Sequence, residues 1–443
     1  MINLKSLYMN KYFAAFIILL SFSACQKGEI NSLNTPVVDG ITANPTRSDL
    51  FNLVTGAESG MRNNIAAYLD GTGVIGREIY RFSGAEPRYT TDLLGGGTKR
   101  LDNNTFYITN PWASRYQVIR QCFILLDAIR NTRSAIASDA QKKAFTGFAK
   151  TLIGYQLLLN INMTDSNGAR IPVPNGATLG PVITDPGVVM DSVLKFLDDG
   201  KADLTGSEVM FPLSDGFLGF KDAAGLLKFN RALAARVYTY RKNWTAALTA
   251  LNESFYDLNG TLTTGVYHSF STNGGDLANT MYLAPNGNGE VRVANPSFVN
   301  DIVAGDDRIN KTALRTSSAS QSGLTGNRDL TIWNSLNSPV SIIRNEELIL
   351  IYAEAKIQTS AFPDAIVALN RIRTAHNLPA YAGAVTSAAL LTELLYNRRY
   401  SLFMEGHWWI DARRYGLLGT LPKDRPDDDV WARYPLPQNE SNI

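Results

Sequence analysis

Apolar residues recur at helical spacing over most of this chain, and two of the helical stretches resemble each other. The segment WTAALTALN at 244–252 aligns with FPDAIVALN at 362–370, and the same offset aligns Ala235 with Ala353. In both copies a helix with small residues precedes the aromatic residue, which would fill the space at the turn. This pattern predicts two tetratricopeptide-like helical pairs, each covering the apolar face of the next. The alternative is a coincidence between two ordinary helical hairpins.

The remaining apolar periodicity predicts a mainly α fold. The two pairs fall in 225–254 and 343–377, and further helices are expected over 46–70, 112–136, 139–163, 188–204 and 387–415, the last as one helix or two. Residues 260–340 are rich in Gly, Ser, Asn and Thr and carry only short apolar runs. We therefore expect loops and a few strands there, as a loop-rich insertion in one domain over 46–443.

The N-terminal residues have the layout of a secretory signal. A short basic start and an unbroken apolar core at 14–20 precede Cys25. This core is too short to span a bilayer, which needs about 20 helical residues. The alternative is a membrane anchor or a buried helix. The run FSAC at 22–25 resembles the lipobox of bacterial lipoproteins, so residues 1–24 are expected to be removed and Cys25 to be lipidated.

The charge and the cysteine content limit the kinds of partner and chemistry expected of this protein. Removal of residues 1–24 takes away two lysines and no acids, which brings the net charge of +2 close to zero. A nucleic-acid partner is therefore not expected, because it would require a basic surface. Residues 25–45 are polar and contain Pro and Gly, which predicts an extended tether. Cys122 lies in an apolar helical run and is expected to be a buried, inert thiol.

The sequence offers no recognisable catalytic or metal site. His268, His376 and His407 stand far apart, without a second histidine at metal-ligand spacing. No G-x-S-x-G motif presents a nucleophilic serine. The run DSNG at 165–168 begins like a calcium loop but lacks the closing acid, so a turn is expected. We predict no enzyme activity, no metal and no cofactor; a surface glycosidase with an unmarked pair of acids remains an alternative.

Aromatic side chains outside the helical cores predict a binding surface. They gather in the first loop region and in the 260–340 insertion: Tyr80, Phe82, Tyr89, Tyr107, Trp112, Tyr267, Phe270, Tyr282 and Trp333. Sugar rings stack on such side chains, although each ring could instead fill a small core under its own loop. We expect Trp333, Tyr89 and Arg81 to converge on a shallow ligand cleft, because polar residues flank the two aromatic rings.

Several longer stretches together resemble the SusD/RagB family of outer-membrane nutrient-binding lipoproteins. Besides the lipobox at 22–25, they are LLKFNRALAARVYTYRKNWTAAL at 226–248, IIRNEELILIYAEAKIQ at 342–358, ALNRIRTAHNLP at 368–379, LLYNRRYSLFMEGHWWIDARRYG at 394–416 and YPLPQNESN at 434–442. The resemblance covers nearly the whole chain, and the C-terminal third is its most specific part.

The resemblance implies a helical scaffold of tetratricopeptide-like pairs with an irregular binding lobe. It implies a surface-exposed, lipid-anchored protein of the outer membrane that binds glycans, or peptides in some members, and passes them to a TonB-dependent SusC-like transporter. The matching motifs are scaffold residues: Tyr352, Ala353, Ala355, Arg371, Glu405, Trp408 and Trp409. We also expect Glu405 to form ion pairs that tie the helices together, with Arg398, Arg399, Arg413 and Arg414.

Overall fold

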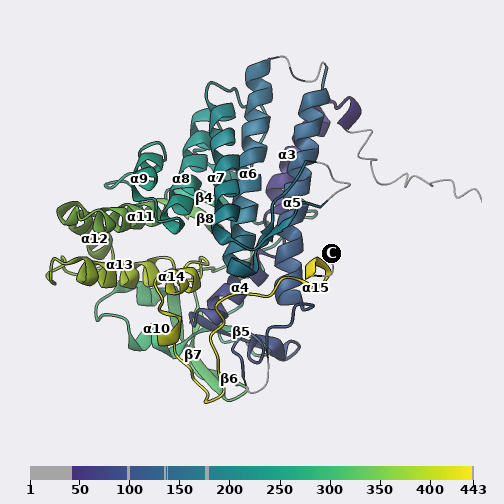
Figure 1. The fold of residues 1–443 in the computed structure, drawn as a ribbon. Helices are drawn as coiled ribbons and strands as arrows, with labels where there is room; N and C mark the ends of the chain where they lie inside the picture. Colours follow the sequence, from purple (N-terminus) through teal and green to yellow (C-terminus); the bar gives the residue numbers. More distant parts are fainter. Residues whose placement is uncertain (1–41, 97–99, 134–135, 137, 175–178, 442–443) are drawn as a thin grey trace, which may run out of the picture.

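Long helices lie side by side in one half of the molecule, shorter helices form a second group, and a small sheet lies at one end (Figure 1). The computed structural model describes residues 42–96, 100–133, 136, 138–174 and 179–441. The predicted signal at 1–24, Cys25 and most of the tether lie outside the described residues. In the part of the chain that is described, no helix is both long and apolar enough to cross a membrane.

Residues 47–240 supply the first group of helices. They are α3 (Arg47–Gly60), α4 (Ile65–Ile75), α5 (Phe106–Asn131), α6 (Asp139–Thr164), α7 (Pro186–Leu204) and α8 (Ala223–Tyr240). The helix predicted over 46–70 is two helices, because Asn64 takes a left-handed conformation with φ 54°. α5 begins before Pro111 rather than after it, and α6 is capped by Ser138, whose hydroxyl accepts a hydrogen bond from the Gln141 N–H at 3.2 Å.

The two predicted helical pairs are present and pack against each other. α8 forms a hairpin with α9 (Trp244–Asn252), and α11 (Asn345–Gln358) forms one with α12 (Phe362–Ala375). α11 also contacts α8, α9 and α13 (Ser387–Ser401). Ala235 and Ala353, which the alignment pairs, are both fully buried, so their small side chains allow the close approach of the helices. The predicted mainly α fold with paired helices is confirmed.

The segment predicted over 387–415 is two helices. α13 is followed by α14 (Trp408–Arg414), and the turn between them contains left-handed Met404 and Gly406, with φ values of 61° and 80°. This turn directs Glu405 away from the expected partners: it pairs with Arg344, at 2.8 Å. The prediction of ion pairs from Glu405 to the four neighbouring arginines was therefore wrong.

Other carboxylates hold those arginines and tie the C-terminal helices together. Asp411 accepts from Arg398 at 2.6 Å and from Arg414 at 2.7 Å. Arg414 also contacts Glu354 of α11 at 2.9 Å. These groups are buried, and a buried charge keeps its ionised form only where partners surround it. The network thus links α11, α13 and α14 through a few side chains.

The 260–340 insertion contains four of the eight strands in the described part of the chain, in keeping with the strands expected there. Its strands are β4 (Gly265–His268), β5 (Glu290–Ala294), β6 (Thr312–Gln321) and β7 (Leu324–Leu330). β1 (Ile79–Ser83) comes from the N-terminal region and completes an antiparallel sheet in the order β1-β5-β7-β6. β4 pairs with β8 (Val340–Arg344). The insertion is therefore joined to the helical body by strand pairing at two places.

The remaining elements are short. They are β2 (Ala169–Arg170), β3 (Val182–Ile183), α10 (Pro296–Asn300), α15 (Gln438–Ser441) and the 3₁₀ turns η1 (Pro87–Tyr89), η2 (Asp165–Asn167), η3 (Asp215–Phe217), η4 (Asp307–Lys311) and η5 (Leu418–Thr420). The DSNG segment forms η2, as predicted for a turn. Cys122 is fully buried in α5, as expected, and burial raises the pKa of its thiol, which disfavours the reactive thiolate.

Candidate functional site

Two of the three predicted ligand residues lie together. Arg81 is on β1 and Tyr89 is in η1, and the Arg81 guanidinium carbon is 5.3 Å from the centre of the Tyr89 ring. Arg81 also pairs with Glu290, and its Nε is 3.6 Å from a carboxylate oxygen of Asp70. Only 8% of Arg81 is exposed, and its guanidinium donates hydrogen bonds to groups of the protein itself.

Trp333, the third predicted ligand residue, belongs to the main hydrophobic core and is 5% exposed. Its loop at 331–339 is held by Ser338, whose hydroxyl oxygen accepts hydrogen bonds from the Asn334 and Ser335 N–H groups at 3.0 Å each. The ring would have to leave this core to stack on a ligand. The assignment of Trp333, Tyr89 and Arg81 to a ligand cleft stays a prediction.

The loop that carries Trp333 supports a second loop, at 269–282. Asn279 donates its backbone N–H to the Leu336 carbonyl and its side-chain amide to the Ser338 carbonyl, both at 2.7 Å. The Thr272 N–H donates to the side chain of Asn337 at 3.1 Å. The insertion therefore uses one loop to fix the position of the other, and the supported loop lines a cavity.

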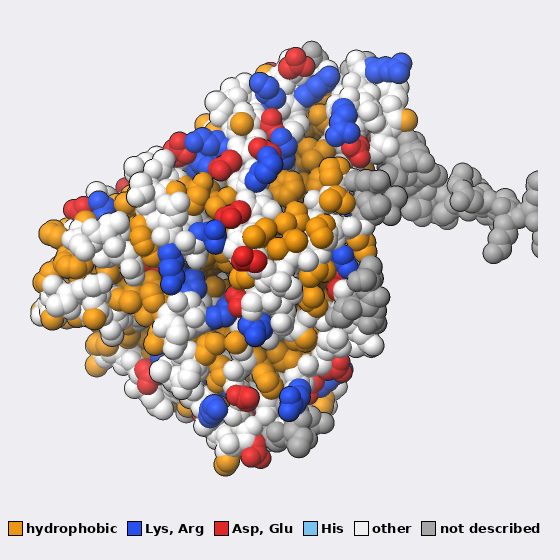
Figure 2. All heavy atoms as spheres, in the orientation of Figure 1, with side chains coloured by type: hydrophobic (Ala, Val, Ile, Leu, Met, Phe, Trp, Pro, Cys, Tyr) orange, Lys and Arg blue, Asp and Glu red, His pale blue; other side chains and the backbone are white. Residues whose placement is uncertain are grey.

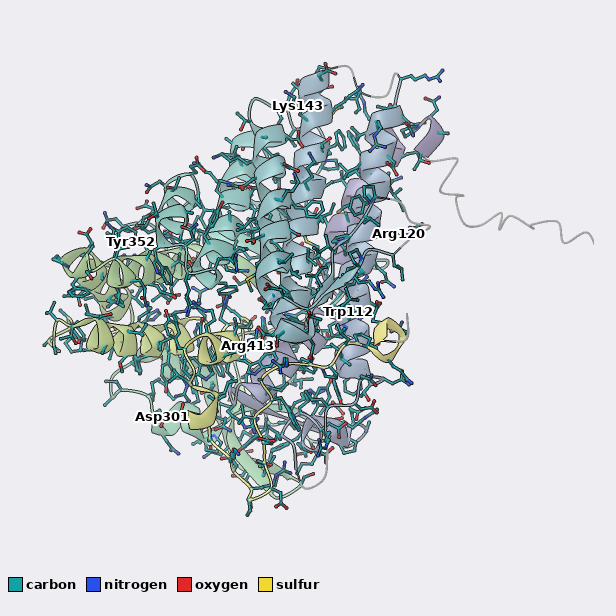
Figure 3. All side chains as sticks on the ribbon, viewed as in Figure 1. Trp112, Arg120, Lys143, Asp301, Tyr352 and Arg413 are labelled. Carbon is teal, nitrogen blue, oxygen red and sulfur yellow. The ribbon has the colours of Figure 1, made fainter. Side chains whose placement is uncertain are left out.

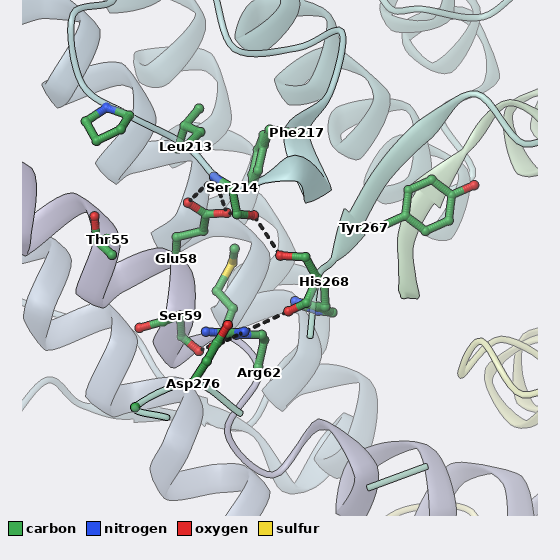
Figure 4. A pocket seen from close by; sticks show the side chains of 14 residues that line it. Thr55, Glu58, Ser59, Arg62, Leu213, Ser214, Phe217, Tyr267, His268 and Asp276 are labelled. Atoms are coloured by element: carbon green, nitrogen blue, oxygen red, sulfur yellow. Dashed lines mark hydrogen bonds and ion pairs between the residues drawn. The ribbon is translucent and has the colours of Figure 1, made fainter. Parts of the chain in front are cut away.

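That cavity is the candidate functional site (Figure 4). It has a volume of about 450 Å³ and lies between α3, the segment around η3, and β4 with the loop after it; its lining residues are Thr55, Glu58, Ser59, Met61, Arg62, Pro212, Leu213, Ser214, Phe217, Tyr267, His268, Ser269, Gly275 and Asp276. This volume falls in the range of about 300–1,000 Å³ that is typical of small-molecule sites.

Glu58 and two serines form a hydrogen-bonded chain on one side of the cavity. The backbone N–H of Ser214 donates to both carboxylate oxygens of Glu58 at 3.2 Å, and the Ser214 hydroxyl donates to the same carboxylate. The Ser269 hydroxyl in turn donates to the Ser214 oxygen at 2.8 Å. Burial raises the pKa of Glu58, and the hydrogen bonds from Ser214 oppose that shift. The chain fixes the carboxylate in one orientation.

Arg62 and Asp276 form the charged pair on the opposite side. The Arg62 guanidinium is 2.7 Å from the Asp276 carboxylate and also donates to the Ser269 carbonyl at 2.7 Å. Arg62 follows the end of α3, where buried Arg115 of α5 donates to the carbonyl of Met61 at 2.9 Å and to that of Asn63. Hydrogen bonds from α5 therefore stabilise the turn that carries Arg62.

His268 lies at the buried end of the cavity and is 2% exposed. Among the described residues, its Nε2 atom has no hydrogen-bond partner. Burial, and then the positive charges of Arg115 and Arg62, lower the pKa of His268 to about 3. The imidazole is therefore neutral at pH 7, and its Nε2 atom is buried.

Sequence reasoning placed one lining residue, Tyr267, among the aromatic residues of a predicted binding surface, but it did not identify Glu58, Arg62, Ser214 and Asp276. Glu58 and Arg62 are four positions apart, a spacing that places an acid and a base on one helix face, and this is the only local signal. Ser214 and Asp276 lie in segments without a motif and meet Glu58 and Arg62 only through tertiary packing.

A second hollow lies on the outer face of α5. It has a volume of about 460 Å³ and is lined partly by Trp112, Tyr116, Arg120 and the C-terminal segment. Figure 3 shows Trp112 on α5 beside α15, and the Trp112 indole donates to Glu440 at 3.3 Å. On the face shown in Figure 2, basic and acidic side chains alternate over the long helices, in keeping with the low net charge.

The structure thus combines a mainly α fold with a partly enclosed cavity that is lined by both polar and apolar side chains. Residues 324–442 match the family model described as the SusD family. The comparison with curated proteins gave no match.

Among solved structures, the fold is similar to a SusD superfamily protein from Bacteroides vulgatus, with 15% identity, a TM-score of 0.69, and coverage of 89% of this chain and 97% of that one. It is also similar to a laminarin-binding SusD-like protein, with 16% identity, a TM-score of 0.64, and coverage of 90% and 97%. A surface glycan-binding protein A from Bacteroides uniformis matches with 17% identity, a TM-score of 0.62, and coverage of 84% and 88%. The predicted resemblance to the SusD family is confirmed, and the chain has the SusD fold.

Proposed function

We propose that this protein captures an oligosaccharide at the cell surface and passes it, intact, to a TonB-dependent SusC-like transporter of the outer membrane. The observation that carries the proposal is the SusD fold, which superposes on a laminarin-binding SusD-like protein over 90% of this chain. The cavity at α3 supports it, because its lining includes carboxylate, guanidinium and hydroxyl groups, which can bind sugar hydroxyls.

Anchoring is part of the same proposal. A signal at 1–24, a lipid on Cys25 and a tether at 25–45 would hold one domain, 46–443, at the outer membrane. A thioether-linked diacylglycerol with a further acyl chain provides the two hydrophobic signals that stable anchoring needs. The support for this arrangement is the lipobox-like FSAC run and the polar segment that follows it.

One experiment distinguishes a binding protein from an enzyme. Oligosaccharides and peptides are titrated into the full-length protein by calorimetry, and the ligand is then recovered and analysed by chromatography. We expect an oligosaccharide to bind and to be recovered unchanged. Cleavage of the ligand would identify a surface glycosidase, and binding of peptides alone would identify a peptide-binding member of the family.

The location of the ligand is proposed at the cavity of Figure 4, with the Arg81–Tyr89 surface as the other candidate. The two candidates draw on different residues, so substitutions distinguish them. Loss of affinity in Arg81→Ala, with full affinity in variants of the cavity, would assign the ligand to the surface around β1.

A further inference from the structure

A small internal cavity lies where five elements of the fold meet. It has a volume of about 20 Å³ and is lined by residues of α4, α6, α8, β8 and the turn between α13 and α14. All of these residues are buried except Ser341 and Glu405, which are partly buried. One water molecule needs roughly 10–15 Å³ of such space. The cavity can therefore hold a single water and is too small for a sugar ring.

Two polar atoms of the lining residues lack a partner in the protein. The Oγ of Ser341 on β8 and the Oδ1 of Asn162 on α6 are both buried, and neither has a hydrogen-bond partner among the described residues. A buried donor or acceptor that is left unpaired costs the desolvation energy of that group. Folded proteins therefore pair such atoms with protein groups or with ordered water.

The hydroxyl of Tyr68 is a third polar group at the same cavity. Tyr68 belongs to α4 and is 3% exposed. Burial raises the pKa of its hydroxyl, and a hydrogen bond from the side chain of Asn162 opposes that shift. The amide nitrogen of Asn162 is thus engaged by Tyr68, which leaves the amide oxygen for another donor. The two hydroxyls and this oxygen together offer the donors and acceptors that a buried water uses, typically about three.

The charged groups around the cavity already have partners of opposite charge. Arg236 binds Glu347 through two hydrogen bonds of 2.6 Å. Glu405 accepts a hydrogen bond from Arg344 at 2.8 Å. Burial lowers the pKa of His407 to about 4, so this side chain is neutral at pH 7. An ion in the cavity would lack a free counter-charge in a buried setting, whereas a neutral water needs none.

We propose that this cavity is a hydration site that holds one internal water molecule, which bridges the Ser341 hydroxyl and the Asn162 side-chain oxygen. In this position the water joins β8 to α6 and so ties the strand at the end of the 260–340 insertion to the helical body. The site and the cavity of Figure 4 have no lining residue in common within the described part of the chain, so the inference does not depend on the proposed function.

A crystal structure of the full-length protein in detergent, at a resolution that shows single waters, tests the site directly. We expect one density peak at about 2.6–3.0 Å from both Ser341 Oγ and Asn162 Oδ1. An empty cavity, or a direct hydrogen bond between the two side chains, would overturn the inference. A peak at the shorter distances of about 2.0–2.5 Å that metal ions make to oxygen would also overturn it.

The number of long-lived internal waters in solution is measured by ¹⁷O magnetic relaxation dispersion. Ser341→Val replaces the hydroxyl with apolar methyl groups and should lower this number by one. The matched control is Ser318→Val, at an exposed serine of β6, which should leave the number unchanged. An equal number in the wild type and in a Ser341→Val variant with unchanged circular dichroism would contradict the proposal. Should Ser341→Val not fold, the crystal structure of the wild type decides.

Discussion

Trp408 and Trp409 are neighbours in the sequence but lie in different environments. Trp409 is fully buried, and its indole N–H donates to the Trp431 carbonyl at 2.8 Å. Trp408 is only partly buried and lies under the guanidinium of Arg399, whose central carbon is 5.5 Å from the ring centre. The sequence predicted scaffold roles for both residues. Their different extents of burial imply that they contribute differently to stability.

We expect Trp409→Ala to lower the free energy of unfolding by about 3–5 kcal/mol, because it leaves a large cavity in the core. Trp408→Ala should cost less, since this side chain is only partly buried. Urea denaturation followed by circular dichroism measures both changes. Equal losses in the two variants would contradict the assignment. Neither substitution should alter oligosaccharide affinity.

His407 makes the stability depend on pH. It is 4% exposed, its Nδ1 lies 3.2 Å from the Tyr240 hydroxyl, and burial lowers its pKa from the ordinary 6.5 to about 4. Between these two values the unfolded chain binds a proton at this site and the folded chain does not. The contribution of His407 to stability is therefore complete above pH 6.5 and is lost as the pH falls towards 4.

The expected slope from this one residue is at most about 1.4 kcal/mol per pH unit. It is measured as the difference in unfolding free energy between the wild type and His407→Gln at several pH values from 4 to 7. The difference should shrink or change sign as the pH falls, because the glutamine does not titrate. A difference that stays constant over this range would show that His407 is not held neutral in the folded state.

At the level of elements, the insertion depends on contacts between its loops. Asn279 is fully buried and joins the 269–282 loop to the 331–339 loop by two hydrogen bonds. Trp333 lies in the second of these loops with its ring in the core. The loop that lines the cavity therefore takes its position from a neighbour that does not line it.

Trp333→Ala tests the role of that ring. With 5% exposed, Trp333 should contribute mainly to stability, so its loss should cost about 3–5 kcal/mol and lower the melting temperature. A weakening of oligosaccharide binding by tenfold or more at an unchanged melting temperature would instead support the predicted role in ligand contact. Calorimetric unfolding and ligand titration on the same sample distinguish the two results.

Most helices could be predicted from the sequence, while their ends were less certain. The spacing of apolar residues located α6, α7 and both helical pairs, because a helix that packs on one face repeats its apolar residues with the helical period. The break at Asn64 and the start of α5 before Pro111 were missed. Both depend on the backbone conformation of single residues. The packing around such a residue determines its conformation, and the periodicity of apolar residues carries no information about it.

On the scale of the whole molecule, the proposed membrane attachment rests on Cys25, which precedes the described residues. We expect labelled palmitate to be incorporated into the wild type and not into Cys25→Ala, and the variant to leave the membrane fraction. The reason is that the lipobox-like FSAC run presents this cysteine for acylation. Equal labelling of the two proteins would refute the anchor. Oligosaccharide affinity should be the same in both, since the proposed lipid would be attached outside the folded domain.

The sequence by itself determined the helical class, the paired helices, the loop-rich insertion and the family resemblance, because each is written in local patterns of apolar, small and aromatic residues. Only the tertiary structure decided which polar groups meet. Glu58 and Ser214 are far apart in the chain, as are Arg62 and Asp276, yet each pair is in direct contact at one cavity. Such contacts depend on long-range packing of α3, η3 and the 269–282 loop, for which a single sequence carries no local signal.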